Sequence, residues 1–249
     1  SEEIDQSDDA AAAPTTVSLK EDGDFIAYRE SHPDHQDNIQ ISWQALATNV
    51  LFRVTIKQLM AHMGLDSVQY AKKLATYMNG VPDGIKAEEI KFDGFHARWL
   101  RPKGQKRTTK TLLYLPGGGF VFPASSGHTA VVSSLAKKMK AQGLLVNYRL
   151  APEHPFPAGL EDAISAYKYL LDQGIPPNDI VIAGDSAGGG LTLSLLLSIK
   201  DEGLPMPRAA SIICPLADLS FSGESRDFNR WRDPMLPTSR KMKAFEEYS

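Results

Sequence analysis

The sequence predicts an α/β fold in which a mostly parallel sheet carries helices on both faces. Three observations lead to this prediction. Short apolar runs of strand length alternate with longer segments of helical period. Two of those runs are followed within three residues by glycine clusters, at residues 117–119 and 188–190. Finally, 249 residues, 42% of them hydrophobic, are enough to bury one large core.

The first third of the chain precedes the strands. Residues 1–24 are acidic and low in complexity, so we expect a flexible lead-in, with an arm packed on a partner subunit as the alternative. Within residues 25–84, apolar side chains recur every three or four positions from Ile41 onward, which predicts helices. The first helix is marked by Trp43, Leu46, Val50 and Val54. A second helix is expected from Asp66, its N-cap, to Gly80.

Residues 85–221 change to a strand pattern and form the predicted core. A hairpin is expected over Glu88–Pro102, with Asp93-Gly94 at its turn. Buried strands are expected at 111–116, 144–149, 179–185 and 210–216, with helices at 130–140, 157–171 and 191–199 between them. Cys214, the single cysteine, lies in the last apolar run and is expected to be buried. Residues 222–249 are polar, and their second half is expected to be helical.

Composition argues against several classes of function. The net charge of −3 and the lack of a basic run give no sign of a nucleic-acid partner. No apolar stretch approaches the roughly 20 residues that span a bilayer. No metal site is predicted, because no His, Cys or carboxylate cluster has ligand spacing. The glycine clusters match neither nucleotide-binding motif, so no cofactor is expected. A cytoplasmic location is favoured, with a processed, secreted form as the alternative.

Gly184-Asp185-Ser186-Ala187-Gly188 fits the pattern G-x-S-x-G between a predicted strand and a predicted helix. Such a turn strains the serine backbone and requires small neighbours on both sides. We therefore expect the Ser186 hydroxyl to project at the carboxyl end of the sheet, beside the free N–H groups of a helix start. The alternative is a glycine-rich turn with an incidental serine.

The other glycine cluster follows an earlier buried strand, in the segment from Pro116 to Phe120. Glycine lacks a Cβ atom, so the N–H groups of such a loop can turn toward a ligand oxygen. Acyl transfer develops negative charge on a carbonyl oxygen, and aimed N–H donors stabilise that charge. A glycine loop after the third strand, followed later by G-x-S-x-G, is the α/β-hydrolase arrangement.

At these motifs the chain resembles the hormone-sensitive-lipase-like carboxylesterases, also called bacterial family IV. The resemblance rests on PGGGF (116–120), NYRLAPEHPFPAGLED (147–162), GDSAGGG (184–190) and CPLADLS (214–220). It covers roughly residues 85–235 and implies an α/β-hydrolase fold, with 25–84 and 222–249 as two segments of a helical cap. It also implies hydrolysis of short-chain acyl esters, a small-molecule substrate and, as a frequent assembly, a homodimer.

Residue by residue, the resemblance implies that Ser186 is the nucleophile. It implies that the N–H groups of Gly118, Gly119 and Ala187 form the oxyanion hole. Pro116 departs from the family pattern, which usually has histidine there, so we expect oxyanion binding to be tuned rather than abolished. Asp185 belongs to the motif and is expected to be a scaffold hydrogen-bonder. The substrate-binding residues expected from the cap are Trp43, Phe52 and Met60.

Activation of the serine needs a general base, usually a histidine held by a carboxylate. In α/β hydrolases the order is serine, acid, histidine. All six histidines precede Ser186: His32, His35, His62, His96, His128 and His154. His128, at the start of a helix, is the alternative base, whereas Asp218 and Asp233 come too early to be the acid.

We therefore expect the acid and base to lie outside this sequence, past Ser249 or on a complementary C-terminal fragment, which leaves the sheet incomplete. Two other readings stay open: a catalytically idle small-molecule-binding protein on a hydrolase scaffold, and an inactive truncated fragment.

Overall fold

A computed structural model describes residues 42–55, 57–58, 80–106, 108–220, 222 and 233–236. Six strands form one sheet in the order β1-β2-β4-β3-β5-β6. The strands are β1 (Ile85–Lys91), β2 (His96–Pro102), β3 (Thr111–Leu115), β4 (Gln142–Asn147), β5 (Ile180–Asp185) and β6 (Ala209–Ile213). The helices are α2 (Trp43–Val54), α5 (Ser126–Met139), α6 (Ala158–Asp172) and α7 (Ser186–Asp201), with a short 3-10 helix, η2 (Pro177–Asp179).

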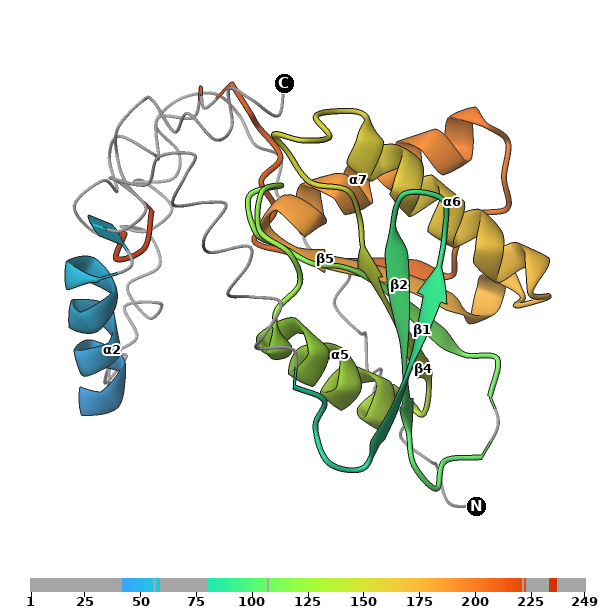
Figure 1. The fold of residues 1–249 in the computed structure, drawn as a ribbon, viewed down its shortest axis with the longest axis horizontal. Coiled ribbons are helices and arrows are strands. Elements are labelled where there is room, and N and C mark those ends of the chain that lie inside the picture. The colour runs from blue at the N-terminus through green and yellow to red at the C-terminus, as the bar shows by residue number, and fades with distance from the viewer. Residues whose placement is uncertain are drawn as a thin grey trace, which may run out of the picture. The chain divides into compact units, whose positions relative to one another are not determined.

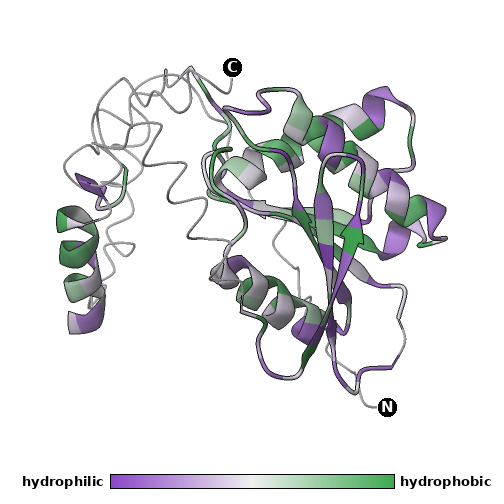
Figure 2. Ribbon diagram, viewed as in Figure 1, coloured by the Kyte–Doolittle hydropathy of each residue, from purple (hydrophilic) through white to green (hydrophobic). Residues whose placement is uncertain are grey.

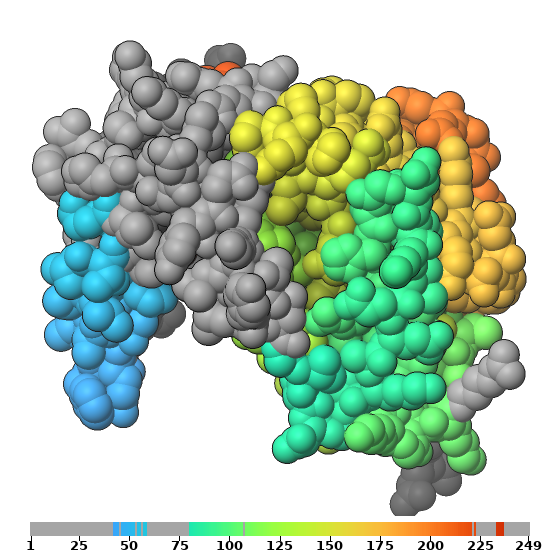
Figure 3. All heavy atoms as spheres, in the orientation of Figure 1, coloured from blue at the N-terminus to red at the C-terminus, as the bar shows by residue number. Residues whose placement is uncertain are grey.

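The sheet is antiparallel at one edge and parallel elsewhere. β1 and β2 form the predicted hairpin, in which Gly94 adopts a φ of 80° at the turn. β1 is largely hydrophilic and exposed at the surface (Figure 2, Figure 3), whereas Ala97, Trp99 and Leu100 of β2 are buried. β2 runs antiparallel to β4, whereas β4, β3, β5 and β6 are parallel. The predicted α/β fold is confirmed, and β3 ends beside β5 with Leu115 opposite Gly184.

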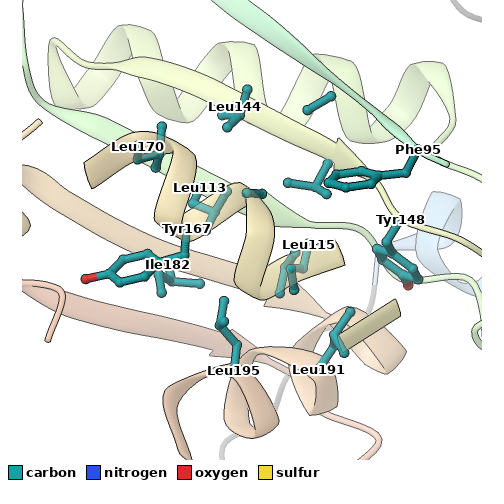
Figure 4. Packing of buried hydrophobic residues seen from close by; sticks show 14 of the residues in the cluster. Phe95, Leu113, Leu115, Leu144, Tyr148, Tyr167, Leu170, Ile182, Leu191 and Leu195 are labelled. Atoms are coloured by element: carbon teal, nitrogen blue, oxygen red, sulfur yellow. The ribbon is translucent and has the colours of Figure 1, made fainter. Parts of the chain in front are cut away.

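Helices cover both faces of the sheet, with α5 on one side and α6 and α7 on the other (Figure 1). The strand side chains therefore alternate between two cores. Leu113, Leu115 and Ile182 pack with residues of α6 and α7 such as Tyr167 and Leu195 (Figure 4). A second cluster, on the α5 side, is formed by Leu100, Leu112, Tyr114, Ala124, Val132, Leu145 and Ala183. Burial on both faces explains why these strands are continuous apolar runs.

Two helices begin earlier than the sequence pattern predicts. α5 starts at Ser126 because Ser125 and His128 form a capping box that fixes its first turn. α7 starts at Ser186, so the three consecutive glycines Gly188–Gly190 lie inside a helix. Close packing explains them, since a Cβ on Gly190 would lie 2.3 Å from the Leu216 carbonyl oxygen. The helix uses glycine despite its poor propensity because its neighbours leave no room for a side chain.

One prediction on the last strand is wrong. Cys214 is exposed, not buried, and has a left-handed backbone with a φ of 44°. The reason is its position just past β6, which is the edge strand among the described residues and is itself largely exposed.

α2 agrees with the first predicted helix, and its apolar residues are exposed, with Trp43 at 74%. The second predicted helix, from Asp66 to Gly80, lies outside the described residues except for its last residue. The division into a lead-in, two cap segments and a core stays a prediction. None of the helices in the described part of the chain is long and apolar enough to cross a membrane.

Candidate active site

The serine turn joins β5 to α7 at the carboxyl end of the sheet. Ser186 is exposed and has a φ of 51°, an unusual backbone conformation for a residue with a side chain. A Cβ on Gly184 would lie 2.3 Å from the Gly188 carbonyl oxygen, and one on Gly188 would lie 2.0 Å from that of Leu115. Only glycine fits these two positions, and the missing Cβ atoms allow the sharp bend that leaves Ser186 exposed.

The glycine loop after β3 lies next to this turn, because β3 and β5 are neighbours. Gly118 and Gly119 have φ values of 134° and 60°, and the Gly118 carbonyl accepts hydrogen bonds from the N–H groups of Val121 and Phe122. Among the residues the structure describes, no acceptor is present for the N–H groups of Gly118 and Gly119. Ala187 contributes another N–H from the first turn of α7, where no acceptor exists within the helix.

Pro116 is anchored by other means than a histidine side chain. The Tyr148 hydroxyl donates a hydrogen bond of 2.7 Å to the Pro116 carbonyl. At the next residue, the Gly117 N–H donates to Asp185 Oδ1 over 3.0 Å. The loop is thus held at two successive residues, and neither contact uses an N–H of Gly118 or Gly119. The expectation that Pro116 tunes oxyanion binding rather than abolishing it stays a prediction.

Asp185 connects the two loops. Besides Gly117, its Oδ1 accepts a hydrogen bond of 2.9 Å from the Tyr114 hydroxyl. Its Oδ2 lies 3.6 Å from His128 Nε2, longer than an ordinary hydrogen bond but close enough for an electrostatic contact. Burial raises the pKa of Asp185, but the interactions with His128, Gly117 and Tyr114 outweigh it and hold the pKa below its usual value. Burial and the nearby carboxylate raise the pKa of Tyr114, so its hydroxyl stays a donor.

His128 is not placed as the base that activates the serine. Its Nδ1 accepts a hydrogen bond of 3.0 Å from the Ser125 N–H, so in the neutral ring the proton lies on Nε2. That nitrogen faces Asp185. Both ring nitrogens are therefore engaged, and the alternative of His128 as general base is not supported.

The motif at residues 147–162 contacts the glycine loop and helps to hold it in place. Asp162 has a 2% exposed side chain and accepts hydrogen bonds from the Arg149 backbone N–H (2.7 Å) and guanidinium Nε (2.9 Å). The Ala151 N–H donates to the carbonyl of Phe120, at the end of the glycine loop. On the other side, the Leu216 N–H donates to the Ser186 carbonyl over 2.8 Å. Both reactive loops are thus held by backbone contacts outside themselves.

The remaining candidates do not complete a triad within the described residues. Asp218 accepts hydrogen bonds from Ser220 and Ser222, which lower its pKa to about 2, and Asp233 caps a turn at Met235. No histidine in the described ranges hydrogen-bonds to Ser186, and no group of three metal-ligating side chains occurs there.

Of the expected cap residues, Trp43 and Phe52 are exposed on α2. Met60, like His32, His35 and His62, lies outside the described residues. A role for these cap side chains in binding substrate stays a prediction.

Comparison with known proteins places these features in context. Residues 112–249 match the sequence family described as having the alpha/beta hydrolase fold. An acetyl-hydrolase of Streptomyces hygroscopicus is 40% identical over 169 residues, which are 68% of this chain and 55% of that protein. The chain spans about half the length of the curated relatives it matches in this way.

Solved structures agree with the sequence relatives. The protein EstE5, in a crystal soaked with p-nitrophenyl butyrate, is 36% identical with a TM-score of 0.73, covering 83% of this chain and 69% of its own. An esterase from the bacterial hormone-sensitive lipase family is 31% identical with a TM-score of 0.69, covering 81% of this chain and 68% of its own.

Proposed function

Because this chain belongs to the α/β-hydrolase family, in its hormone-sensitive-lipase-like group, we propose that it hydrolyses carboxylic esters with short acyl chains. Ser186 is the proposed nucleophile, and the N–H groups of Gly118, Gly119 and Ala187 are the proposed oxyanion hole. The names of the relatives support the substrate class, since one is an acetyl-hydrolase and another was soaked with a butyrate ester.

In the proposed reaction, Ser186 Oγ attacks the ester carbonyl carbon while a general base takes the hydroxyl proton. The carbonyl oxygen becomes an oxyanion that the three N–H groups stabilise. When the intermediate collapses, the bond to the alcohol oxygen breaks and the base returns the proton to the leaving alcohol. Water then attacks the acyl-enzyme in the same way, which releases the carboxylic acid and restores the serine.

The single observation that carries the proposal is the exposed, positive-φ serine next to a glycine loop whose Gly118 and Gly119 N–H groups have no acceptor among the described residues. A strained backbone at an exposed polar residue is a feature of functional sites. The acid and base are proposed to come from outside the described residues.

Hydrolysis of p-nitrophenyl butyrate by the intact protein tests this proposal. Ser186→Ala should reduce kcat by at least about 10,000-fold, because loss of one triad member costs about 10⁴- to 10⁶-fold in kcat. Ser194→Ala, farther along α7, serves as the matched control and should retain activity. Equal hydrolysis by wild type and Ser186→Ala would refute the assignment of the nucleophile.

A second candidate is a binding protein that holds small esters without turnover. One observation favours it: within the described residues, Ser186 has no histidine partner. Saturable binding of an ester by the intact protein, without product formation, would support this candidate over the esterase. A homodimer and a cytoplasmic location also stay proposals.

A further inference from the structure

We propose that Asp185 and His128 act as a positioning pair that fixes the glycine loop against the serine turn. The inference rests on the proposed function and extends it to two residues that do not touch the reacting atoms. Asp185 directly precedes the proposed nucleophile, and its partner Gly117 directly precedes the two proposed oxyanion donors. One carboxylate thereby sets the spacing between the attacking hydroxyl and the N–H groups.

The carboxylate is aimed by contacts on both of its oxygens. Oδ1 accepts hydrogen bonds from the Gly117 N–H (3.0 Å) and the Tyr114 hydroxyl (2.9 Å), and Oδ2 faces His128 Nε2 at 3.6 Å. Space around it is tight, because a Cβ on Gly117 would lie 2.4 Å from Oδ2. The side chain therefore has little freedom to turn away from the loop.

His128 is held in one orientation from the other side. The Ser125 N–H donates to Nδ1 over 3.0 Å, and this N–H belongs to the N-cap of α5. A backbone N–H is an obligate donor, so it selects the ring form that carries its proton on Nε2. The hydrogen bond at the N-cap of α5 thus orients the His128 Nε2–H toward Asp185. A histidine that served only as a cap would not need to face this carboxylate.

Substitutions at position 128 separate the two roles of the histidine. The side-chain oxygen of His128→Asn can replace Nδ1 as acceptor for Ser125, but the shorter side chain does not reach Asp185. His128→Gln places an amide donor near the position of Nε2 and loses the cap geometry. If His128 positions Asp185, His128→Asn should lower kcat for p-nitrophenyl butyrate about 10-fold, and His128→Gln should lower it less. The reverse order would overturn the proposal.

Substitution of the carboxylate gives the larger effect. Asp185→Asn should lower kcat of the intact protein about 100-fold and change KM less than about threefold, since misplaced donors weaken the transition state and not substrate binding. Asp201→Asn, which removes an exposed charge at the other end of α7, is the matched control. An unchanged kcat in Asp185→Asn, or a loss confined to KM, contradicts the proposal.

Nuclear magnetic resonance separates a failure of this inference from a failure of the proposed function. In wild type, the His128 ring nitrogens should show the Nε2-protonated form. The Gly117 amide proton should exchange with solvent faster in His128→Asn than in His128→Gln. These readouts hold even in a protein that hydrolyses no ester, and they remain usable if Asp185→Asn does not fold. An Nδ1-protonated ring, or equal Gly117 exchange in both variants, overturns the inference.

Discussion

The substitution Gly188→Ala tests whether the close approach of α7 to β3 shapes the serine turn. The added Cβ would lie 2.0 Å from the Leu115 carbonyl oxygen and 2.7 Å from the Pro116 carbonyl carbon, whereas ordinary contact begins at 3.4 Å. Helix α7 would have to retreat by more than 1 Å, because both neighbours are backbone atoms that cannot rotate away. Overpacking of this kind costs about 1–3 kcal/mol, and contact with backbone favours the upper end.

The sign of the effect is informative, because helix propensity alone favours the substitution. Alanine is better than glycine inside a helix by about 1 kcal/mol. If the clash costs about 3 kcal/mol, the free energy of unfolding should fall by about 2 kcal/mol. This lowers Tm by about 4–8 °C in a chain of this size. The same retreat moves Ser186 from the glycine loop, so kcat should fall about 100-fold.

Thermal unfolding of a graded series checks this reasoning. At Gly189 the added Cβ would lie 3.1 Å from Pro215 Cα, so Gly189→Ala should lose less stability than Gly188→Ala. Gly80→Ala meets nothing within 4 Å and serves as the control. A Gly188→Ala protein as stable as wild type would show that the close approach of α7 to β3 does not shape the turn.

Two further substitutions and one pH dependence have defined outcomes. Tyr148→Phe removes the hydrogen bond to the Pro116 carbonyl, so the free energy of unfolding in urea should fall by about 1 kcal/mol. It should also lower kcat with little change in KM, and a rise in KM alone would argue against anchoring of the loop. Asp162→Asn leaves the Arg149 guanidinium without its buried partner, and should cost about 3 kcal/mol, so a cost below about 1 kcal/mol would contradict the role of this ion pair. The pKa of Asp185 is lowered on folding, so its stabilisation is present above the unfolded pKa of 3.8 and is lost as the pH falls through the folded value. The unfolding free energies of wild type and Asp185→Asn should therefore differ most at about pH 7 and least at about pH 2, and a difference that grows toward acid would be inconsistent with that shift.

Much of the fold could be predicted because the parallel strands are buried on both faces. Leu112 to Leu115 form one continuous apolar run, and Ile180 to Ala183 form another. Such runs allow the positions of the strands along the chain to be predicted. The start of α7 could not be predicted from periodicity. Three consecutive glycines at 188–190 are typical of a loop, unless the residues that pack against them in the fold are known. The exposure of Cys214 could not be predicted either. An apolar run indicates burial, but an edge strand is buried only where another element packs against it.

The site was predictable where a motif encodes backbone geometry. Gly184 and Gly188 are spaced so that neither can carry a Cβ, and that spacing is visible in the sequence. The contacts of Asp185 with Gly117 and His128 join residues far apart in the chain, so no local pattern shows them. A weak signal existed in the Ser125 to His128 spacing, which resembles a capping box with histidine at the third position.

A crystal structure of the intact protein after reaction with a fluorophosphonate tests the central claim most directly. We predict that phosphorus is bonded to Ser186 Oγ and that the phosphoryl oxygen lies about 2.7–3.1 Å from the N atoms of Gly118, Gly119 and Ala187. Phosphorus on another side chain, or a phosphoryl oxygen turned away from all three N–H groups, would contradict the account.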